Sequence, residues 1–273
     1  MVERIMVMRH FKDQDNLFYE NNSPVVEDEL LRVKNIAAEI AYRATEDGFN
    51  SINLITSNKA RAEMTTRAVA NRVALFLPTT YEIDTRIREL DQGKYVLPGG
   101  YKPGDHFQPL QDAWGIFFKE TFSEENILYR FGDPVSLEDG SFKYPQIAGA
   151  FEECGENQIE FSIRFYSFIS DLCGRFGNSP EALPLVVTHQ ALAARIAELG
   201  HIMNKLKNND IERPIPGSMP RLEWQAFQEI RDNTEMFIEF GGIATMGLSD
   251  AAKFVDILNS EVNHLRSLQT KNR

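Results

Sequence analysis

The chain has 273 residues, of which 40 are acidic and 29 basic, so its formal net charge is −11. With 42% hydrophobic and 25% charged residues, the composition is that of a globular protein with a sizeable core, which excludes a disordered or fibrous chain. The acidic surplus disfavours nucleic acid as a partner, and no apolar run approaches the ~18 residues that a membrane helix needs.

The sequence also lacks the signs of a secreted protein. Only Cys154 and Cys173 are present, too few for a disulfide-built fold, and the first residues do not contain the apolar segment of a signal peptide. We therefore expect a cytoplasmic protein without membrane partners.

Buried strands are predicted where short apolar runs end directly in polar residues. Three such runs occur, at residues 5–8, 52–55 and 185–187. Apolar side chains at helical spacing connect the first two strands over residues 29–45, and further helices are predicted after the second and third strands, at 59–75 and 190–206. This alternation indicates right-handed crossovers in a parallel sheet, and therefore the α/β class.

Residues 91–150 break this pattern, because glycines, prolines and aromatic residues mix there without a sustained period. A linker would not carry so many aromatic residues, so we interpret the segment as a cap inserted over the carboxyl ends of the strands. A helix, a surface loop, two strands and a final helix are predicted beyond it, at 156–175, 208–220, 236–240, 243–248 and 250–268. The fold predicted for residues 1–273 is one domain, a three-layer αβα sandwich with a mainly parallel central sheet and an inserted cap.

Basic side chains follow the three predicted strands: Arg9 and His10 after the first, Arg61 after the second and His189 after the third. Ligands of α/β proteins bind at the carboxyl ends of parallel strands, so we expect these side chains to converge. Guanidinium groups match phosphate oxygens, and neutral imidazole is a nucleophile toward phosphorus. A single histidine at a strand end is more often a capping or surface residue, and Arg61 alone could be a solvated helix residue. The coincidence of three strand ends favours a phosphate site.

Five short motifs occur in order between residue 1 and about residue 200. They are Met8-Arg9-His10 with Asn16 after it, Thr56-Ser57-Asn58-Lys59-Ala60-Arg61-Ala62 with Thr65, Arg88-Glu89-Leu90-Asp91-Gln92-Gly93, Gly155-Glu156-Asn157 with Arg164, and Val186-Val187-Thr188-His189. In this order they resemble the motifs of the histidine phosphatase superfamily, also called the phosphoglycerate mutase-like family. Each motif is weak alone, and five in order are a specific signal.

The resemblance implies a site for phosphoryl transfer. Its implied catalytic residues are His10, Glu89, His189, Arg9 and Arg61, and its implied phosphate-binding residues are Arg9, Asn16, Arg61 and His189. In this scheme His10 forms a phosphohistidine, while Glu89 protonates the leaving oxygen and later accepts a proton from water. Arginine and histidine neutralise the phosphoryl oxygens, so neither a metal nor a cofactor is expected, and the sequence contains no metal-ligand spacing.

Two positions depart from the family pattern. The glycines that follow the two histidines in the family are Phe11 and Gln190 in this chain. A side chain there either lines the pocket or alters it, so both are candidate substrate contacts. Tyr101, Lys102 and His106 of the predicted cap are further candidates, although a solvent-facing side chain is the simpler interpretation of His106, as a turn former is of Asn16.

We therefore predict a phosphatase that hydrolyses the phosphomonoester of a small metabolite, such as a sugar phosphate or a nucleotide. The segment after Gly93 does not resemble that of the glycolytic mutase, which favours a phosphatase over a phosphomutase of the same family. A non-catalytic member that binds a phosphorylated ligand is the other alternative, motivated by Phe11 and Gln190. The expected partner is a small phosphorylated substrate, and exposed aromatic residues could also serve a homodimer.

Overall fold

A computed structural model describes residues 4–11, 29, 31–89, 91, 93–95, 151–176, 181–233, 242–247 and 251–271. The chain forms two compact units: one joins Met1–Glu89 to Phe165–Glu261, and the other joins Leu90–Arg164 to Val262–Arg273. Most of the predicted cap and the strand predicted at 236–240 lie outside the described residues. Within the described part of the chain, no helix combines the length and the apolar character needed to cross a membrane.

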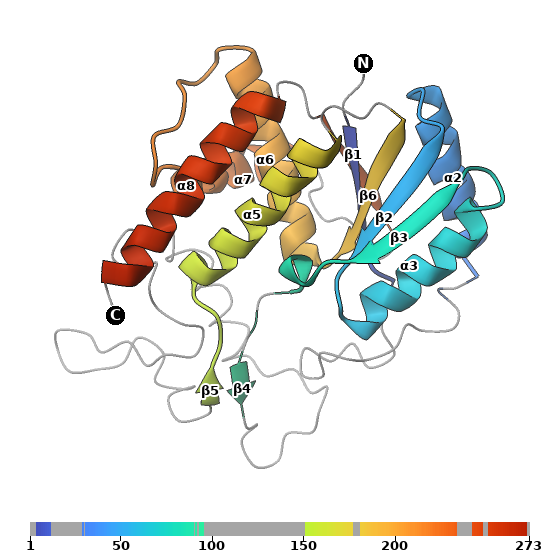
Figure 1. Ribbon diagram of the computed structural model, residues 1–273, viewed down its shortest axis with the longest axis horizontal. Coiled ribbons are helices and arrows are strands. Elements are labelled where there is room, and N and C mark those ends of the chain that lie inside the picture. The colour runs from blue at the N-terminus through green and yellow to red at the C-terminus, as the bar shows by residue number, and fades with distance from the viewer. Residues whose placement is uncertain are drawn as a thin grey trace. The chain divides into compact units, whose positions relative to one another are not determined.

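The first unit is built on a five-stranded sheet with the order β3-β2-β6-β1-β7 (Figure 1). Its strands are β1 (Arg4–Arg9), β2 (Ser51–Thr56), β3 (Thr79–Ile83), β6 (Ala182–Thr188) and β7 (Ile243–Gly247). Four of them are parallel, and β7 runs antiparallel to β1 at one edge. The three strands predicted from apolar runs lie at the centre of the sheet. The edge strand β3 escaped prediction because Thr79, Thr80 and Glu82 leave it without an apolar run. Its Tyr81 and Ile83 are exposed, as is common on an edge strand.

Helices cover both faces of this sheet (Figure 1). The helices that the structure describes are α2 (Val33–Glu46), α3 (Ala60–Val73), α5 (Gln158–Phe176), α6 (Gln190–Lys207), α7 (Met219–Asn233) and α8 (Ala251–Lys271). Of these, α3 contacts the sheet on one face together with α2, and α6 contacts it on the other. Met6 and Met8 of β1 pack into a core with Ile40 of α2 and other side chains of α2 and α3. Ile5 and Val7, which alternate with these methionines, are buried on the opposite face, where α6 contacts β1 and β7. The predicted α/β sandwich with a mainly parallel sheet is therefore confirmed.

The boundaries of the predicted helices agree with the structure to within a few residues, but α7 was not predicted from the sequence. The predicted loop at 208–220 ends at Ser218, and α7 begins at Met219. Pro220 lies in the first turn of α7, where a missing backbone N–H removes no helical hydrogen bond. A proline that suggests a loop in the sequence is thus compatible with the start of a helix.

The second unit contains a two-stranded antiparallel sheet of β4 (Gly93–Tyr95) and β5 (Phe151–Cys154). After β5, the Asn157 side-chain oxygen accepts from the Glu160 N–H at 2.8 Å, and the Asn157 N–H donates to the Glu160 carboxylate at 3.3 Å. This reciprocal pair caps the start of α5. Glu156 is buried and accepts from the Arg164 guanidinium at 2.6 Å. The motif predicted at 155–157 with Arg164 is therefore a capped and ion-paired helix start.

Three glutamates of the first unit are buried near one another, and Arg195 lies beside two of them, Glu198 and Glu223. The three are Glu198 on α6, Glu223 on α7 and Glu261 on α8. Arg195 donates to one oxygen of Glu223 at 2.5 Å, and the Tyr166 hydroxyl donates to the same oxygen at 2.9 Å. Burial raises the pKa of Glu198 to about 8, with the charge of Glu223 as the next cause, and burial raises the pKa of Glu261 to about 7. At neutral pH this cluster holds protons that an unfolded chain would lose.

Glu198→Gln should flatten the pH dependence of the free energy of unfolding. In the wild type, the folded chain binds more protons than the unfolded chain between the ordinary pKa of 4.5 and about 8, so the free energy of unfolding falls as pH rises through this range. The amide does not titrate, so the stability of the wild type relative to the variant should fall by at least about 1.4 kcal/mol, the equivalent of one pKa unit. Urea denaturation at pH 5 and at pH 8 measures this difference in the free energy of unfolding, and the exposed Glu212→Gln is the control. Parallel curves for wild type and Glu198→Gln would rule out the raised pKa.

Candidate active site

The two histidines predicted at strand ends lie side by side. β1 and β6 are parallel neighbours in which Arg9 is paired with Thr188, so His10 and His189 each follow directly after this pair. The His10 N–H donates to the Thr188 carbonyl at 2.9 Å, and the two imidazole centroids are 5.1 Å apart. Both side chains are buried. The register of two central strands thus brings together residues that are far apart in the sequence.

The surroundings of His10 fix which of its two ring nitrogens carries the proton. Nδ1 donates to the Phe11 carbonyl at 2.6 Å, and Nε2 accepts from the Nε–H of Arg61 at 3.1 Å. Because a carbonyl only accepts and a guanidinium only donates, the proton of the neutral ring is on Nδ1 and the lone pair is on Nε2. Burial lowers the pKa of His10 to about 3, and the positive charge of Arg61 is the next cause. His10 is therefore a neutral imidazole with its basic nitrogen directed at a guanidinium.

Arg61, His189 and Glu89 meet at a single carboxylate oxygen. Arg61 Nη2 donates to Glu89 Oε2, and His189 Nδ1 lies 3.4 Å from the same oxygen. On the other side of its ring, His189 Nε2 is 2.9 Å from the Ser57 hydroxyl. Arg61 and His189 can therefore hold one anionic oxygen between them, as the oxygens of a phosphoryl group require.

Two helix N-termini add positive potential to this cluster. Arg61 lies in the first turn of α3, which begins at Ala60, shortly after β2, and His189 is the N-cap residue of α6. Unpaired backbone N–H groups and the helix dipole favour an anion at such a position. The site is thus electropositive, although the whole chain carries a formal charge of −11.

Two threonines hold the segments that carry the site residues. Thr65 Oγ1 accepts from the Phe11 N–H at 3.0 Å and donates to the Arg61 carbonyl at 2.7 Å, so it ties the turn after β1 to α3. Thr188 Oγ1 donates to the Ile87 carbonyl at 2.8 Å and anchors the segment that leads to Glu89. These threonines and Ser57 lie inside the sequence motifs, but the residue types alone assigned them no role.

Phe11 differs from its predicted role. Its side chain is completely buried and belongs to the hydrophobic core cluster with Met8 and Val33, so it packs in the interior instead of lining an open pocket. The side chain of Phe11 is thus accommodated by core packing.

The remaining predicted residues are only partly described. Arg9 is half-buried, and its charge contributes to the lowered pKa of His10. Gln190 is the first residue of α6, and its side chain lies outside the described part of the structure. Asn16, Tyr101, Lys102 and His106 also lie outside the described residues. In the part of the chain that the structure describes, no group of three or more His, Cys, Asp and Glu side chains is arranged to hold a metal ion.

The buried, neutral His10 should destabilise the folded chain at acidic pH. Between its ordinary pKa of 6.5 and about 3, the unfolded chain binds a proton at His10 and the folded chain does not, so the free energy of unfolding falls as pH drops. His10→Gln removes this difference, and its stability relative to the wild type should rise by at least about 1.4 kcal/mol between pH 6.5 and pH 4.5. Chemical denaturation at the two pH values measures this difference in the free energy of unfolding, and the half-buried His201→Gln is the control. An unchanged difference between wild type and His10→Gln would contradict the neutral state of His10.

No protein-family model and no curated protein matches the sequence. Among solved structures, phosphoglycerate mutase from Bacillus anthracis str. Sterne matches with a TM-score of 0.50 at 16% identity, over 94% of this chain and 98% of that chain. The chain has the phosphoglycerate mutase-like fold. Alpha-ribazole phosphatase from Shigella flexneri (TM-score 0.45, 16% identity, 89% of each chain) is also similar, as is a mycobacterial glucosyl-3-phosphoglycerate phosphatase (TM-score 0.45, 16% identity, 71% of this chain and 77% of that chain). The phosphoglycerate mutase-like fold agrees with the superfamily that the five sequence motifs resemble.

Proposed function

We propose that the chain is a histidine phosphatase, which hydrolyses the phosphomonoester of a small metabolite through a phosphohistidine on His10. The observation that carries this proposal is the state of His10, whose Nε2 lone pair is unprotonated and lies 3.1 Å from the Arg61 guanidinium. A nucleophile toward phosphorus needs a free lone pair and a cation beside it to neutralise the phosphoryl oxygens. Both are present at one point of a buried site.

In the first step, His10 Nε2 attacks phosphorus, and the N–P bond forms while the P–O bond to the leaving group breaks. Arg61 gives up its contact with Nε2 and donates to the phosphoryl oxygens instead, together with Arg9 and His189. The leaving oxygen takes a proton from the Glu89 carboxyl group. The position of Glu89 supports this role, because its Oε2 contacts Arg61 and lies 3.4 Å from His189 Nδ1.

In the second step, a water molecule attacks the phosphohistidine. The Glu89 carboxylate accepts the proton of this water, the N–P bond breaks, and inorganic phosphate leaves with His10 neutral again. Arginine, histidine and two helix N-termini provide positive charge around the phosphoryl group, which supports a reaction independent of metal ions. The acidic chain supports a small substrate in preference to a nucleic acid.

The experiment that tests this function is incubation of the full chain with p-nitrophenyl phosphate from pH 4.5 to pH 8, with and without a chelator. We expect turnover that the chelator does not reduce, and a protein-bound phosphate that is labile in acid and stable in alkali after quenching. A panel of sugar phosphates, nucleoside monophosphates and phosphoglycerates then identifies the leaving group. Transfer of the phosphoryl group to a second hydroxyl of the substrate would assign a phosphomutase instead. Phosphate binding without turnover of any ester would assign a binding protein and overturn the proposal.

A further inference from the structure

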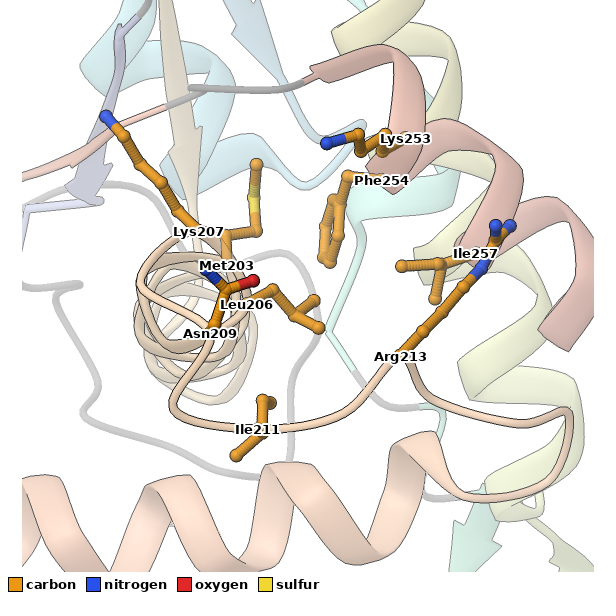
Figure 2. Close-up of a pocket in the computed structure, with 9 residues that line it drawn as sticks. All are labelled: Met203, Leu206, Lys207, Asn209, Ile211, Arg213, Lys253, Phe254 and Ile257. Carbon is orange, nitrogen blue, oxygen red and sulfur yellow. The ribbon is translucent and has the colours of Figure 1, made fainter.

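A cavity of about 330 Å³ opens at the C-terminal end of α6, within the first unit. Met203 and Leu206 of α6 face Phe254 and Ile257 of α8 across it, and Ile211 of the loop after α6 lies below them (Figure 2). These five side chains are all apolar. The volume is at the lower end of the ~300–1,000 Å³ typical of small-molecule pockets.

The rim of this cavity is cationic. Lys207 lies on one side, and Arg213 and Lys253 lie on the other (Figure 2). All three are exposed, and the lining contains no carboxylate, its remaining residue being Asn209. The lining thus has three cations and no acid, in a chain with 40 acidic and 29 basic residues.

The loop that forms the lower wall is held by a specific helix end. Asn209 adopts the left-handed conformation, with φ 60°, and its N–H donates to the Leu206 carbonyl at 3.2 Å. The next N–H, of Asp210, donates to the Lys205 carbonyl at 2.8 Å. These two bonds form a Schellman motif, which turns the chain sharply and brings Ile211 back below the helix. The cavity wall is therefore ordered by backbone hydrogen bonds.

We propose that this cavity binds a small organic anion, a carboxylate carried on an apolar body of about ten carbons. Apolar walls give a bare inorganic ion no partner, and the three cations repel a positively charged head group. The apolar part of such a ligand lies between α6 and α8, and its carboxylate lies at the rim beside Arg213 and Lys253. Met203, the first cavity residue on α6, lies 14 residues beyond His189, so the cavity begins about 21 Å along the helix from the strand-end site and does not depend on the function proposed for it.

Calorimetric titration of the full chain with decanoate and with 1-naphthoate tests this proposal, the first probing a flexible chain and the second a rigid ring. Each titration is run both without and with saturating inorganic phosphate, the probe for the strand-end site. We expect at least one of the two carboxylates to bind about tenfold or more tightly than decyltrimethylammonium, which has the opposite charge. Equal binding of the cation and the carboxylates, no binding of either carboxylate, or displacement of the bound carboxylate by phosphate would overturn the proposal.

Two variants locate the bound probe. Arg213→Gln combined with Lys253→Gln removes two rim charges without changing the core and should weaken carboxylate binding about tenfold. Ile211→Trp places a bulky ring in the cavity and should weaken it at least as much. Arg221→Gln, which removes an exposed cation of α7 outside the cavity, is the matched control and should bind like the wild type. If the double variant and Ile211→Trp both bind like this control, the carboxylate site is elsewhere.

Discussion

His10→Ala is expected to lower kcat/KM for p-nitrophenyl phosphate by at least about 10³-fold while the protein stays folded. Removal of the attacking group from an enzyme that works through a covalent intermediate leaves only the residual effect of binding and charge stabilisation. The neighbouring imidazole that the structure describes, His189, does not take the place of His10, because its Nε2 is engaged by the Ser57 hydroxyl at 2.9 Å. Initial rates and the amount of trapped phosphoenzyme measure the loss.

His201→Ala is the matched control for this experiment. His201 is a half-buried histidine of α6 that contacts Glu229 at 2.8 Å and lies outside the cluster of strand-end residues. Its loss should leave both the rate and the trapped phosphoenzyme at wild-type levels. If His10→Ala retains most of the wild-type rate, or if it still accumulates phosphoenzyme, His10 is not the nucleophile and the proposed function is wrong.

The convergence of the site was predictable because it follows from strand register. Buried apolar runs identify β1, β2 and β6, and parallel pairing places the residues that follow them at one edge of the sheet. The order of the motifs adds Glu89, which a period-based analysis alone would not distinguish from other acidic residues. The position of Glu89 depends on the preceding loop, in which the Ile87 carbonyl accepts a hydrogen bond from the Thr188 hydroxyl.

The protonation state of the site was not predictable in the same way. It depends on a hydrogen bond from His10 to the backbone carbonyl of Phe11 and on burial of the ring, and neither is encoded in a residue type or a spacing. The destination of the Phe11 side chain was equally open, since a phenylalanine beside a catalytic residue packs into a core as readily as it lines a pocket. The buried glutamates Glu198 and Glu223 interrupt the apolar pattern of their helices, and their burial is visible only in the packed structure.

Net charge is a poor guide to what this chain binds at short range. The formal charge of −11 excludes a broad basic surface, yet both the strand-end site and the cavity beside α6 are locally cationic. The two differ in their surroundings. The first offers two helix N-termini and hydrogen-bond donors to a compact anion, whereas the second offers apolar walls to an anion with a hydrocarbon body. Local composition, more than the sum of charges, therefore distinguishes the ligands that we propose for them.

Glu89→Gln is expected to slow poor leaving groups far more than good ones. The amide keeps the shape of the side chain and its position beside Arg61, but it cannot protonate the leaving oxygen. p-Nitrophenolate leaves readily without a proton, so kcat/KM for its ester should fall about tenfold or less, whereas an alkyl phosphate should lose about 10²–10⁴-fold, the usual contribution of a general acid. The ratio kcat/KM is the correct readout, since it covers the steps up to phosphoryl transfer onto His10.

Two comparisons separate this role of Glu89 from a purely structural one. Glu63→Gln removes a carboxylate of α3 that pairs with Arg67 at 2.5 Å outside the site, and it should change neither substrate class. Binding of inorganic phosphate distinguishes the alternatives further: Glu89→Gln removes the negative charge that now contacts Arg61, so phosphate should bind the variant at least as tightly as the wild type. Equal slowing of both ester classes together with weaker phosphate binding would identify Glu89 as a residue that positions Arg61, and the proton donor would have to be sought elsewhere.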